Sequence, residues 1–275
     1  MVKFSVYERK LTLFIFVKIM AEHKNTFSIG FVGDIHGDFD IIKENVKKYN
    51  IEASVLFQVG DMGIGFGEYT AKKKKILADL NKFLRDRNII LYVVKGNHDN
   101  PKFFDGSHNR SNIILMKDYD VVDVWIGEEK RRVLGVGGAI SVDKDACDDV
   151  VDFEGNSWPG LTEGVNWWPE EKFILNKEKI SKLKDVDVVV THTCPDITNS
   201  NLIESHIAKW TKNNPTLKKA LKKEHAQMSE MYRLLEKNNN ITTWVFGHLH
   251  HSKKEKIGKT KFILLGINEF YSLYL

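Results

Sequence analysis

The sequence predicts an α/β fold with buried parallel strands, and three observations support this prediction. Five short apolar runs, rich in β-branched residues, have the composition of strands that are buried on both faces. Helical patterns follow the first two runs, and such alternation indicates a layered domain with at least one βαβ unit. Each run ends at a polar cluster that contains Asp, His or Asn, and α/β folds place their functional sites at the carboxyl ends of such strands.

The five strands are taken in chain order. They cover residues 27–32, 55–59, 89–94, 186–190 and 242–246. The polar clusters that follow them are Asp34-Ile35-His36-Gly37-Asp38, Gly60-Asp61-Met62-Gly63, Gly96-Asn97-His98-Asp99, Thr191-His192-Thr193 and Gly247-His248-Leu249-His250. Because the carboxyl ends of parallel strands meet at one edge of a sheet, we expect these side chains to gather at a single edge.

Helices and further strands are expected between these clusters. Apolar residues at helical spacing predict helices over residues 40–48, 69–87, 200–211 and 217–237. Short runs at 113–115, 121–125 and 132–135 predict strands separated by turns, so this half of the sheet is expected to be antiparallel or mixed. A last strand over residues 261–265 is expected to close the sheet.

The composition is that of an ordinary globular protein. The chain has 275 residues, 42% of them hydrophobic and 28% charged, with a formal net charge of +4. This balance permits an anionic substrate, but a dedicated nucleic-acid binder would concentrate its charge in a stripe. The densest basic run, residues 72–75, is either a solvated helix face or a phosphate-binding surface, and we favour the first because charge blocks usually face water.

The two cysteines, Cys147 and Cys194, are too few for a disulfide framework and fit a reducing compartment, so we expect a cytoplasmic protein. Cys194 follows His192 closely and is either a ligand or nucleophile, or a small buried residue at a strand end. The neighbouring candidate ligands are hard oxygen and nitrogen types, which favours the buried residue.

The N-terminal segment, residues 1–26, is expected to be a lead-in to a single domain over residues 27–275. Its apolar run at 11–20 is interrupted by Lys18 and has no small-residue cleavage site after it, unlike a signal peptide. A transmembrane helix needs roughly 20 apolar residues, so no membrane association is expected. The run is interpreted as an extra strand or packed segment, and both Met1 and Met20 remain possible starts.

The segment 141–171 is too long for a structureless connection within a compact domain. It is acidic at its start and carries Trp158, Trp167 and Trp168 near Gly and Pro towards its end. The tryptophans favour an ordered insertion. Two interpretations stay open, a surface flap held by its own aromatic rings and a lid or substrate wall over the site.

The candidate ligands are carboxylates, an amide and imidazoles. They are Asp34, His36, Asp61, Asn97, His192, His248 and His250. Asp61 offers a carboxylate that can bridge two metals. A mixed oxygen and nitrogen set without thiolate suits Mn²⁺, Fe, Zn²⁺, Co²⁺ or Ni²⁺. Two such ions about 3.5–4 Å apart clamp the attacking and leaving oxygens of an in-line phosphoryl transfer.

A glycine stands immediately before four of these candidate ligands. Gly33, Gly60, Gly96 and Gly247 each lie where a strand ends and the chain must turn. We expect them to permit sharp turns, often through positive φ, without a Cβ in the way.

The order of the five blocks, from Asp34 to His250, resembles the calcineurin-like metallophosphoesterase superfamily. The Gly-Gly-Ala-Ile-Ser-Val run at residues 137–142, followed by Trp-Trp-Pro-Glu-Glu at 167–171, looks similar to stand-alone bacterial and phage members of uncertain substrate. The resemblance implies the metallo-dependent phosphatase fold, a four-layer αββα sandwich of two mixed β-sheets flanked by helices. It also implies a dinuclear centre of two divalent or trivalent metal ions, with Mn²⁺ the expected metal and Fe, Zn²⁺, Co²⁺ or Ni²⁺ as alternatives.

The same resemblance assigns roles to individual residues. It implies that Asp34, His36, Asp61 and His250 bind one metal, and that Asp61, Asn97, His192 and His248 bind the second. His98 would protonate the leaving oxygen or stabilise the transition state, and Asp99 would either orient His98 or fix the loop. Asn97 and His98 would also contact the substrate.

Two departures from the protein phosphatases of this superfamily bear on the substrate. Those enzymes carry Gly-Asp-x-Val-Asp-Arg-Gly in the second block, whereas here no Arg follows Asp61 within that pattern, and Asp99 stands where they have Glu. A phosphoserine or phosphothreonine protein substrate is therefore in doubt. Arg110 and Lys102 are candidate phosphate contacts, although ordinary solvated loop charges are the favoured interpretation of both.

The leading hypothesis is a metal-dependent phosphohydrolase, a phosphatase or phosphodiesterase in which a bridging hydroxide attacks phosphorus in line. The substrate is a phosphate ester, with a small molecule, a nucleotide and a phosphoprotein all open. One alternative is a non-catalytic scaffold with the same fold, which would have lost ligands. Another is a nuclease acting on DNA or RNA, which the mild net charge and the acidic stretch disfavour.

Overall fold

The computed structural model describes residues 29–51, 55–67, 70–126, 128–144, 150–151, 157–158, 161–198 and 200–273. The expected lead-in over residues 1–26 and Cys147 lie outside these ranges. Within the described ranges, no helix combines the length and the apolar character needed to cross a bilayer.

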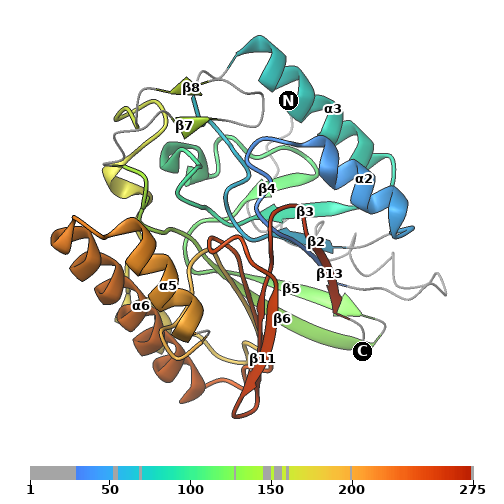
Figure 1. Cartoon of the computed structure of the whole chain (residues 1–275). Coiled ribbons are helices and arrows are strands. Elements are labelled where there is room, and N and C mark those ends of the chain that lie inside the picture. Colours follow the sequence, from blue (N-terminus) through green and yellow to red (C-terminus); the bar gives the residue numbers. More distant parts are fainter. Residues whose placement is uncertain are drawn as a thin grey trace.

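Two mixed β-sheets lie at the centre of the structure (Figure 1). The first has the order β13-β1-β2-β3-β4, with β1 (Ile29–Val32), β2 (Val55–Gln58), β3 (Ile90–Val93) and β4 (Ile113–Leu115) parallel and β13 (Phe270–Leu273) antiparallel to β1. The second has the order β11-β12-β10-β9-β6-β5. Its parallel strands are β6 (Glu129–Val136), β9 (Val188–Thr191), β10 (Thr243–Phe246) and β12 (Thr260–Leu264), and its antiparallel edges are β5 (Asp120–Ile126) and β11 (Lys253–Ile257).

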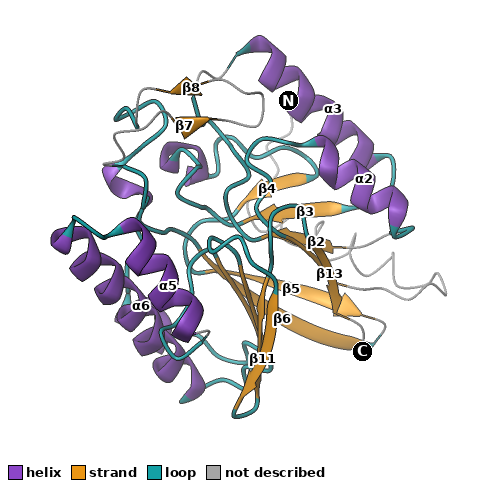
Figure 2. Cartoon of the chain, in the orientation of Figure 1, coloured by secondary structure: helices purple, strands orange, loops and turns teal. Residues whose placement is uncertain are grey.

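Helices cover the outer face of each sheet, which gives the expected four-layer αββα sandwich (Figure 2). The helices on the first sheet are α2 (Asp40–Lys48) and α3 (Ala71–Arg85). Those on the second are α4 (Lys177–Ser181), α5 (Ser200–Trp210) and α6 (Pro215–Glu236). Shorter elements are the 3₁₀ helices η2 (Pro101–Asp105) and η3 (Pro169–Glu171) and a small hairpin of β7 (Val150–Val151) and β8 (Ser157–Trp158).

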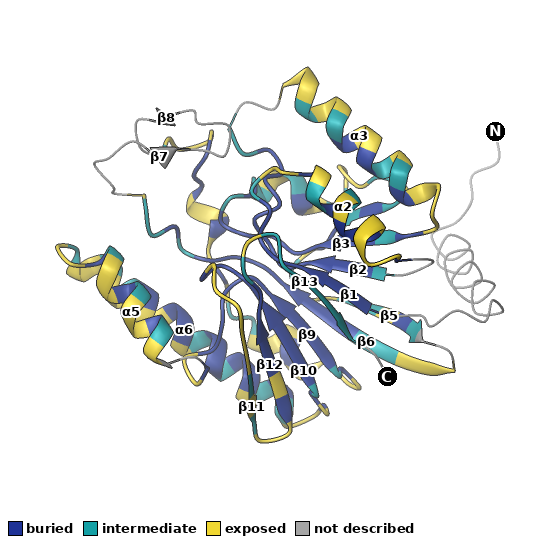
Figure 3. Cartoon of the chain, turned by 45° about the vertical axis from the view of Figure 1, so that its right-hand side comes forward, coloured by how far each residue is buried: buried dark blue, intermediate teal, exposed yellow. Residues whose placement is uncertain are grey.

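Figure 3 shows that the inner strands of both sheets are buried. Their side chains alternate between the core between the sheets and a core under the helices. In β1, Ile29 and Phe31 point into the core between the sheets, whereas Val32 packs under the helices of the first sheet. In β9, Val188 and Val190 face the same central core and Val189 faces the helices of the second sheet. This two-residue period explains why the runs read as continuous apolar segments.

The helix predictions are confirmed, with differences at the starts that capping explains. The helix predicted over residues 40–48 has those bounds. The next begins at Ala71, because the hydroxyl of Thr70 accepts a hydrogen bond from the Lys73 amide, 3.2 Å away. The long C-terminal helix begins at Pro215, ahead of the predicted position 217, because Asn214 caps it through the Leu217 amide at 2.9 Å.

The expectation of a single sheet edge is wrong. The first three clusters follow strands of one sheet and the last two follow strands of the other. The strand near residues 261–265 does not close the sheet either, because β13 follows it and pairs with β1, with Leu273 opposite Ile29. The sequence analysis did not predict β11, because this edge strand is largely exposed. Its sequence, Lys-Lys-Glu-Lys-Ile, therefore has little apolar pattern.

Candidate metal centre

The polar clusters meet where the carboxyl ends of the two sheets adjoin. Those after β1, β2 and β3 come from the first sheet, and those after β9 and β10 come from the second. Side chains separated by as many as 214 residues lie within hydrogen-bonding distance there, as His36 and His250 do. The site therefore lies at the junction between the two sheets.

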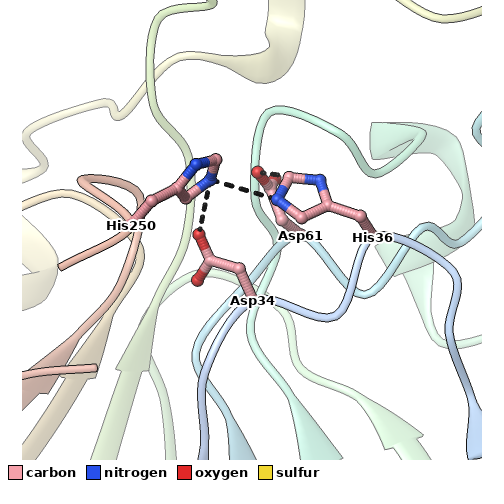
Figure 4. A group of neighbouring side chains, drawn as sticks. All are labelled: Asp34, His36, Asp61 and His250. Atoms are coloured by element: carbon pink, nitrogen blue, oxygen red, sulfur yellow. Dashed lines mark hydrogen bonds and ion pairs between the residues drawn. The ribbon is translucent and has the colours of Figure 1, made fainter. Parts of the chain in front are cut away.

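One set of side chains, here called the outer group, consists of Asp34, His36, Asp61 and His250 (Figure 4). Each offers a ligand atom, and these atoms all lie within 4.8 Å of one another. The Nε2 atoms of His36 and His250 are 3.1 Å apart, and His250 Nε2 is 3.3 Å from the Asp34 carboxylate. Such an arrangement suits one cation at the centre of the four side chains.

A second set, here called the inner group, consists of Asp61, Asn97, His192 and His248. The ligand atoms of Asp61, His192 and His248 also lie within 4.8 Å of one another. Asn97 joins them because its Oδ1 is 3.0 Å from His192 Nε2, which is itself 3.2 Å from Asp61 Oδ1. Asp61 therefore belongs to both groups.

Hydrogen bonds hold the ring of His192 in one orientation. Its Nδ1 lies 2.9 Å from the carbonyl oxygen of Val59, which can only accept, so Nδ1 carries a proton. Its Nε2 then faces Asp61 and Asn97. A backbone partner of this kind is the usual way in which a metal-binding histidine is oriented.

The charges in this cluster fit a cation. Asp34 and Asp61 are buried, and within the described ranges their ion pairs are made with imidazoles. The Oδ1 atom of Asp34 is buried without a hydrogen-bond partner, although Oδ2 accepts from the His248 amide at 2.9 Å. A buried carboxylate oxygen in this state is costly unless a cation approaches it.

Two of the four imidazoles are held neutral by burial, which supports the same conclusion, whereas at His192 and His250 burial is outweighed by the nearby carboxylates, which raise the pKa. Burial lowers the pKa of His36 to about 4 and holds the pKa of His248 well below its ordinary value. Both rings are then neutral and offer a lone pair. Burial lowers the pKa of His192 too, but the charge of Asp61 and its hydrogen bond outweigh it and raise the pKa to about 9. Because the imidazoles outweigh its burial, the pKa of Asp61 stays well below the ordinary range.

Several ligands sit on backbone that non-glycine residues seldom adopt. His36, Asp61, His248 and His250 have φ values of 46°, 56°, 68° and 54°. Left-handed conformations of this kind cost free energy and are common at functional sites. They turn the chain sharply after each strand, so that the side chains point back across the sheet ends.

The glycines differ from the expectation. Gly60 does have a positive φ of 104°, but Gly96 and Gly247 are outside the left-handed region. They are required by close approach instead, because a Cβ on Gly96 would collide with Asp61, and one on Gly247 would collide with the Asp34 carboxylate. Small size, rather than backbone freedom, explains these two positions.

His98 lies beside the outer group and is half-buried. Its ring centroid is 5.1 Å from that of His36, and its amide donates to Asp61 Oδ1 at 2.7 Å. The Asp99 carboxylate accepts from the backbone amides of Met62, Gly63, Ile64 and Gly96 at 2.8–3.3 Å. These bonds tie the second cluster to the third.

The described end of the Trp-rich insertion packs against the loop after Asp61. The amide of Gly67 donates to the carbonyl of Val165 at 2.9 Å, and Trp167 and Trp168 are buried. Phe66 lies between this segment and the site, with its ring centroid 4.6 Å from His98 and 6.3 Å from Trp168. The contacts favour a wall of the site over a free surface flap. Trp158 lies in β8, and its side chain is outside the described part.

The two candidate phosphate contacts are not brought to the ligand groups. Arg110 lines a separate cavity of about 460 Å³ together with Lys74, Phe103 and His108, and none of the candidate ligands lines it. The reason is local: Arg110 precedes β4, where its amide donates to Ile113. Lys102 is an exposed residue of η2, as the solvated interpretation predicted.

Two further interpretations are borne out by burial. Lys72, Lys74 and Lys75 are exposed on α3. Cys194 is fully buried, its Sγ lies 3.8 Å from His225 Nδ1, and burial raises its pKa to about 12. A thiol in this state is neither a nucleophile nor a ready ligand.

The structure adds residues that the sequence did not single out. His206 of α5 makes an edge contact with His248, with ring centroids 5.9 Å apart. His206 lies on the same helix face as the buried residues Ile203 and Ile207. This apolar spacing is the sequence signal from which its inward position could have been predicted. Ser141 and Glu171 lie in the runs 137–142 and 167–171, to which the sequence assigned no role at the site, and they also reach the inner group through contacts described below.

Two sheets that meet at paired groups of carboxylates and imidazoles define a metal-dependent phosphoesterase. The chain belongs to the calcineurin-like phosphoesterase family, which its sequence matches over residues 27–252. It is therefore a hydrolase that acts on phosphoric ester bonds, and it carries candidate ligands for metal. No curated protein sequence matches the chain.

Several solved structures are similar to this chain at low sequence identity. A dimetal phosphatase from Danio rerio is 13% identical, with 91% of this chain and 93% of that chain covered and a TM-score of 0.47. The phosphopantetheinyl hydrolase PptH from Mycobacterium tuberculosis is 12% identical, with coverages of 88% and 90% and a TM-score of 0.46. A putative 5′-nucleotidase from Staphylococcus aureus is 13% identical, with a TM-score of 0.47. The match covers 89% of this chain but only 49% of that one, so the chain spans about half its length.

Proposed function

We propose that this phosphoesterase is a phosphohydrolase with a dinuclear metal centre. The observation that carries the proposal is the position of Asp61, which belongs to both groups of candidate ligands. A carboxylate shared in this way is suited to bridge two cations. In the proposal, the outer group (Asp34, His36, Asp61 and His250) holds one ion. The inner group (Asp61, Asn97, His192 and His248) holds the other.

When bound, two such ions would polarise phosphoryl oxygens and lower the pKa of a water ligand, which makes a nucleophile available near neutral pH. The chain's own contribution is orientation and charge. Backbone groups at the sheet ends hold the carboxylates of Asp34 and Asp61 and the imidazole of His192. The buried wall beside the site limits access of bulk water from that side.

His98 is proposed as the catalytic residue that protonates the leaving oxygen or stabilises the transition state. It lies beside the outer group, is half-buried, and belongs to neither set of ligands. It is therefore free to face a substrate. Asn97 and His98 are the proposed substrate contacts, and Arg110 has no part in the proposal because of the cavity that it lines.

Asp99 is proposed to fix the loop rather than to orient His98. Both of its carboxylate oxygens are engaged by backbone amides of the second and third clusters. Burial and the nearby Asp61 raise the pKa of Asp99 to about 6, and the amides act in the opposite direction. A carboxylate with this many donors has its acceptor capacity used by the backbone.

We retain Mn²⁺ as the expected metal, because the ligands are oxygen and nitrogen atoms without thiolate. We also retain residues 27–275 as one catalytic domain, since β13 near the end of the chain pairs with β1 near its start. The cytoplasm remains the proposed location, on the basis of the two cysteines.

The proposed substrate is a phosphate ester of a small molecule, with a nucleotide included. A phosphoprotein is less favoured, because no arginine follows Asp61 in the second cluster and Phe66 stands in that loop beside His98. A scaffold without catalysis would be expected to lack ligands, and every predicted ligand type is present. No contact among the described residues favours a nuclease.

The test is hydrolysis of p-nitrophenyl phosphate and bis-p-nitrophenyl phosphate, side by side, with added Mn²⁺. EDTA and the Asp61→Ala variant serve as controls. We expect metal-dependent turnover of at least one of the two, and the preferred one distinguishes a monoesterase from a diesterase. Metal-loaded protein that is inert on both, and on a panel of nucleotides, would contradict the proposed function.

A further inference from the structure

A buried chain of hydrogen bonds links the Trp-rich insertion to Asn97. The carboxylate of Glu171 accepts from the indole of Trp167 at 3.1 Å and from the backbone amide of Ser141 at 2.7 Å. It also accepts from the Ser141 hydroxyl at 2.9 Å. The Oγ of Ser141 in turn accepts from Asn97 Nδ2 at 3.2 Å. Three segments far apart in sequence thus converge on one side of the inner group.

The chain of bonds has a direction, which Glu171 sets. Once ionised, the Glu171 carboxylate can only accept, so above its pKa of about 7 the single proton of the Ser141 hydroxyl is directed to Glu171, and the experiment below is run at about pH 8.5. The hydroxyl oxygen is then left with lone pairs alone, which require a donor. The donor is the NH₂ end of the Asn97 amide. The opposite end of that amide, Oδ1, is consequently turned towards His192, 3.0 Å away.

Because these residues are buried, the direction of the hydrogen bonds determines which end of the Asn97 amide faces the inner group. Ser141 and Glu171 are each 1% exposed and Asn97 is 3% exposed, so water does not replace a lost partner. An amide has a donor end and an acceptor end of the same shape, and its neighbours alone decide which end faces a given point. With the ends exchanged, Asn97 would present two N–H groups to the inner group, and an N–H group cannot bind a cation.

We propose that Glu171 is a positioning residue for the inner metal ion. Acting through Ser141, it holds the Asn97 oxygen towards the inner group. The inference rests on the proposed function, since it assumes that Asn97 is a ligand. It gives the insertion a role distinct from both a flap and a lid, because the segment supplies part of the support of the metal site. Hydrogen-bonding partners of metal ligands typically contribute 10–100-fold to metal affinity.

The experiment uses Glu171→Gln, which keeps the size of the side chain and adds a donor. An NH₂ group in place of Glu171 Oε2 would donate to Ser141, and the serine proton would then turn towards Asn97. Mn²⁺ is titrated calorimetrically into chelator-treated full-length protein. We expect the wild type to bind two ions, and Glu171→Gln to bind one of them about 10–100-fold more weakly.

The matched control is Glu224→Gln. Glu224 is 3% exposed and accepts from the amide of Ile140, the residue before Ser141, and among the described residues its hydrogen bonds include neither the Ser141 hydroxyl nor Asn97. It therefore receives the same substitution, at similar burial, one position away. A second variant, Ser141→Ala, removes the acceptor of the Asn97 amide while leaving Glu171 in place. It is expected to weaken the same ion.

The outcomes separate the two proposals. Selective weakening of one ion in Glu171→Gln and Ser141→Ala, with Glu224→Gln like the wild type, supports the inference. Equal Mn²⁺ affinities in Glu171→Gln and the wild type would overturn it. Equal weakening of Mn²⁺ binding in Glu171→Gln and Glu224→Gln would overturn it too, because that result would indicate a general effect of packing. A folded wild type that binds no more than one ion would overturn the proposed dinuclear function as well. Thermal unfolding of the metal-free variants checks that each one is folded.

Discussion

The outer and inner groups use similar side chains in different surroundings. In the outer group, the side chain of His250 is 43% exposed and that of His36 is 12% exposed. The outer Asp34 and the shared Asp61 are buried, and in the inner group His192, Asn97 and His248 are 0%, 3% and 7% exposed. The inner ligands also have identified supports, since Val59 orients His192 and Ser141 orients Asn97. His250 sits at the rim, where water and substrate can reach it.

The comparison shows that one junction between sheets can form two groups of candidate ligands that differ in solvent exposure and in hydrogen-bonding support. Buried ligands with fixed partners are already arranged for an ion, and little freedom is lost when it binds. Rim ligands are more mobile and more accessible. We therefore expect the inner group to retain its ion more firmly, and the outer group to be the side from which substrate approaches.

The largest effect is expected for Asp61→Ala, because this carboxylate belongs to both groups. Both ions should be lost, and turnover should fall by about 10³-fold or more, since two ions contribute several kcal/mol to transition-state stabilisation. Metal content by mass spectrometry, together with Mn²⁺-supplemented turnover, measures this. Retention of one ion at wild-type affinity would show that the two groups do not share Asp61.

His98→Ala should separate catalysis from metal binding. Because His98 belongs to neither group, both ions should bind as in the wild type, while turnover falls by about 10²–10⁴-fold. Mn²⁺ titration and steady-state kinetics on the same preparation give the two readouts. If the variant also failed to bind metal, the role assigned to His98 would be wrong.

The pair His250→Ala and His248→Ala tests the difference between the groups directly. Each should weaken a different ion by at least about tenfold, since loss of a ligand costs no less than loss of a ligand's hydrogen-bonding partner. His250→Ala should spare the ion that chelator removes last from the wild type, whereas His248→Ala should weaken that ion. The order of release under stepwise EDTA measures this, and the opposite order would reverse the comparison.

The smallest effect concerns the pH dependence of stability near the inner group. Burial raises the pKa of Glu224 from 4.5 to about 8, so the folded chain holds this proton more tightly than the unfolded chain does. The resulting stability is fully present below pH 4.5 and is lost as the pH rises through about 8. Glu224→Gln cannot lose a proton there, so its melting temperature should fall less between about pH 5 and 8.5 than that of the wild type, by a few degrees.

Melting curves of metal-free protein at a series of pH values measure this last effect. Glu171 is expected to add to the slope, because burial raises its pKa to about 7. Glu171→Gln in the same series therefore gives a second, smaller reduction. Parallel curves for Glu224→Gln and the wild type would show that Glu224 does not hold its proton in the folded chain.

Local pattern was sufficient for most elements of the fold. The helix over residues 40–48 and the strand over residues 113–115 were predicted with their observed bounds, because apolar spacing and turn residues are local signals. The edge strand β11 and the final strand β13 were missed. Their pairing depends on a neighbour supplied by the rest of the chain, and β13 in particular reaches its place only because it returns to β1.

The candidate ligands were predictable as a set, because Asp, His and Asn at strand ends are visible in the sequence. Their support was not. The contact of Asn97 with Ser141 spans 44 residues and that of Ser141 with Glu171 spans 30. The runs that contain Ser141 and Glu171, residues 137–142 and 167–171, give no sign in the sequence of these contacts. Arg110 shows the converse: it follows the third cluster closely in sequence, yet it lines a separate cavity that none of the candidate ligands lines.

By itself, the sequence determined the residue types of the site, the strands that carry them and the family to which they point. These follow from short-range spacing, which the order of residues fixes directly. The tertiary structure alone decided that the candidate ligands come from two sheets and that the outer group opens to solvent at His250, whereas the inner group is buried. It also decided that the Trp-rich insertion reaches Asn97 through Ser141. Those facts arise from the packing of distant segments, and packing depends on the shape of both partners rather than on the pattern of either one.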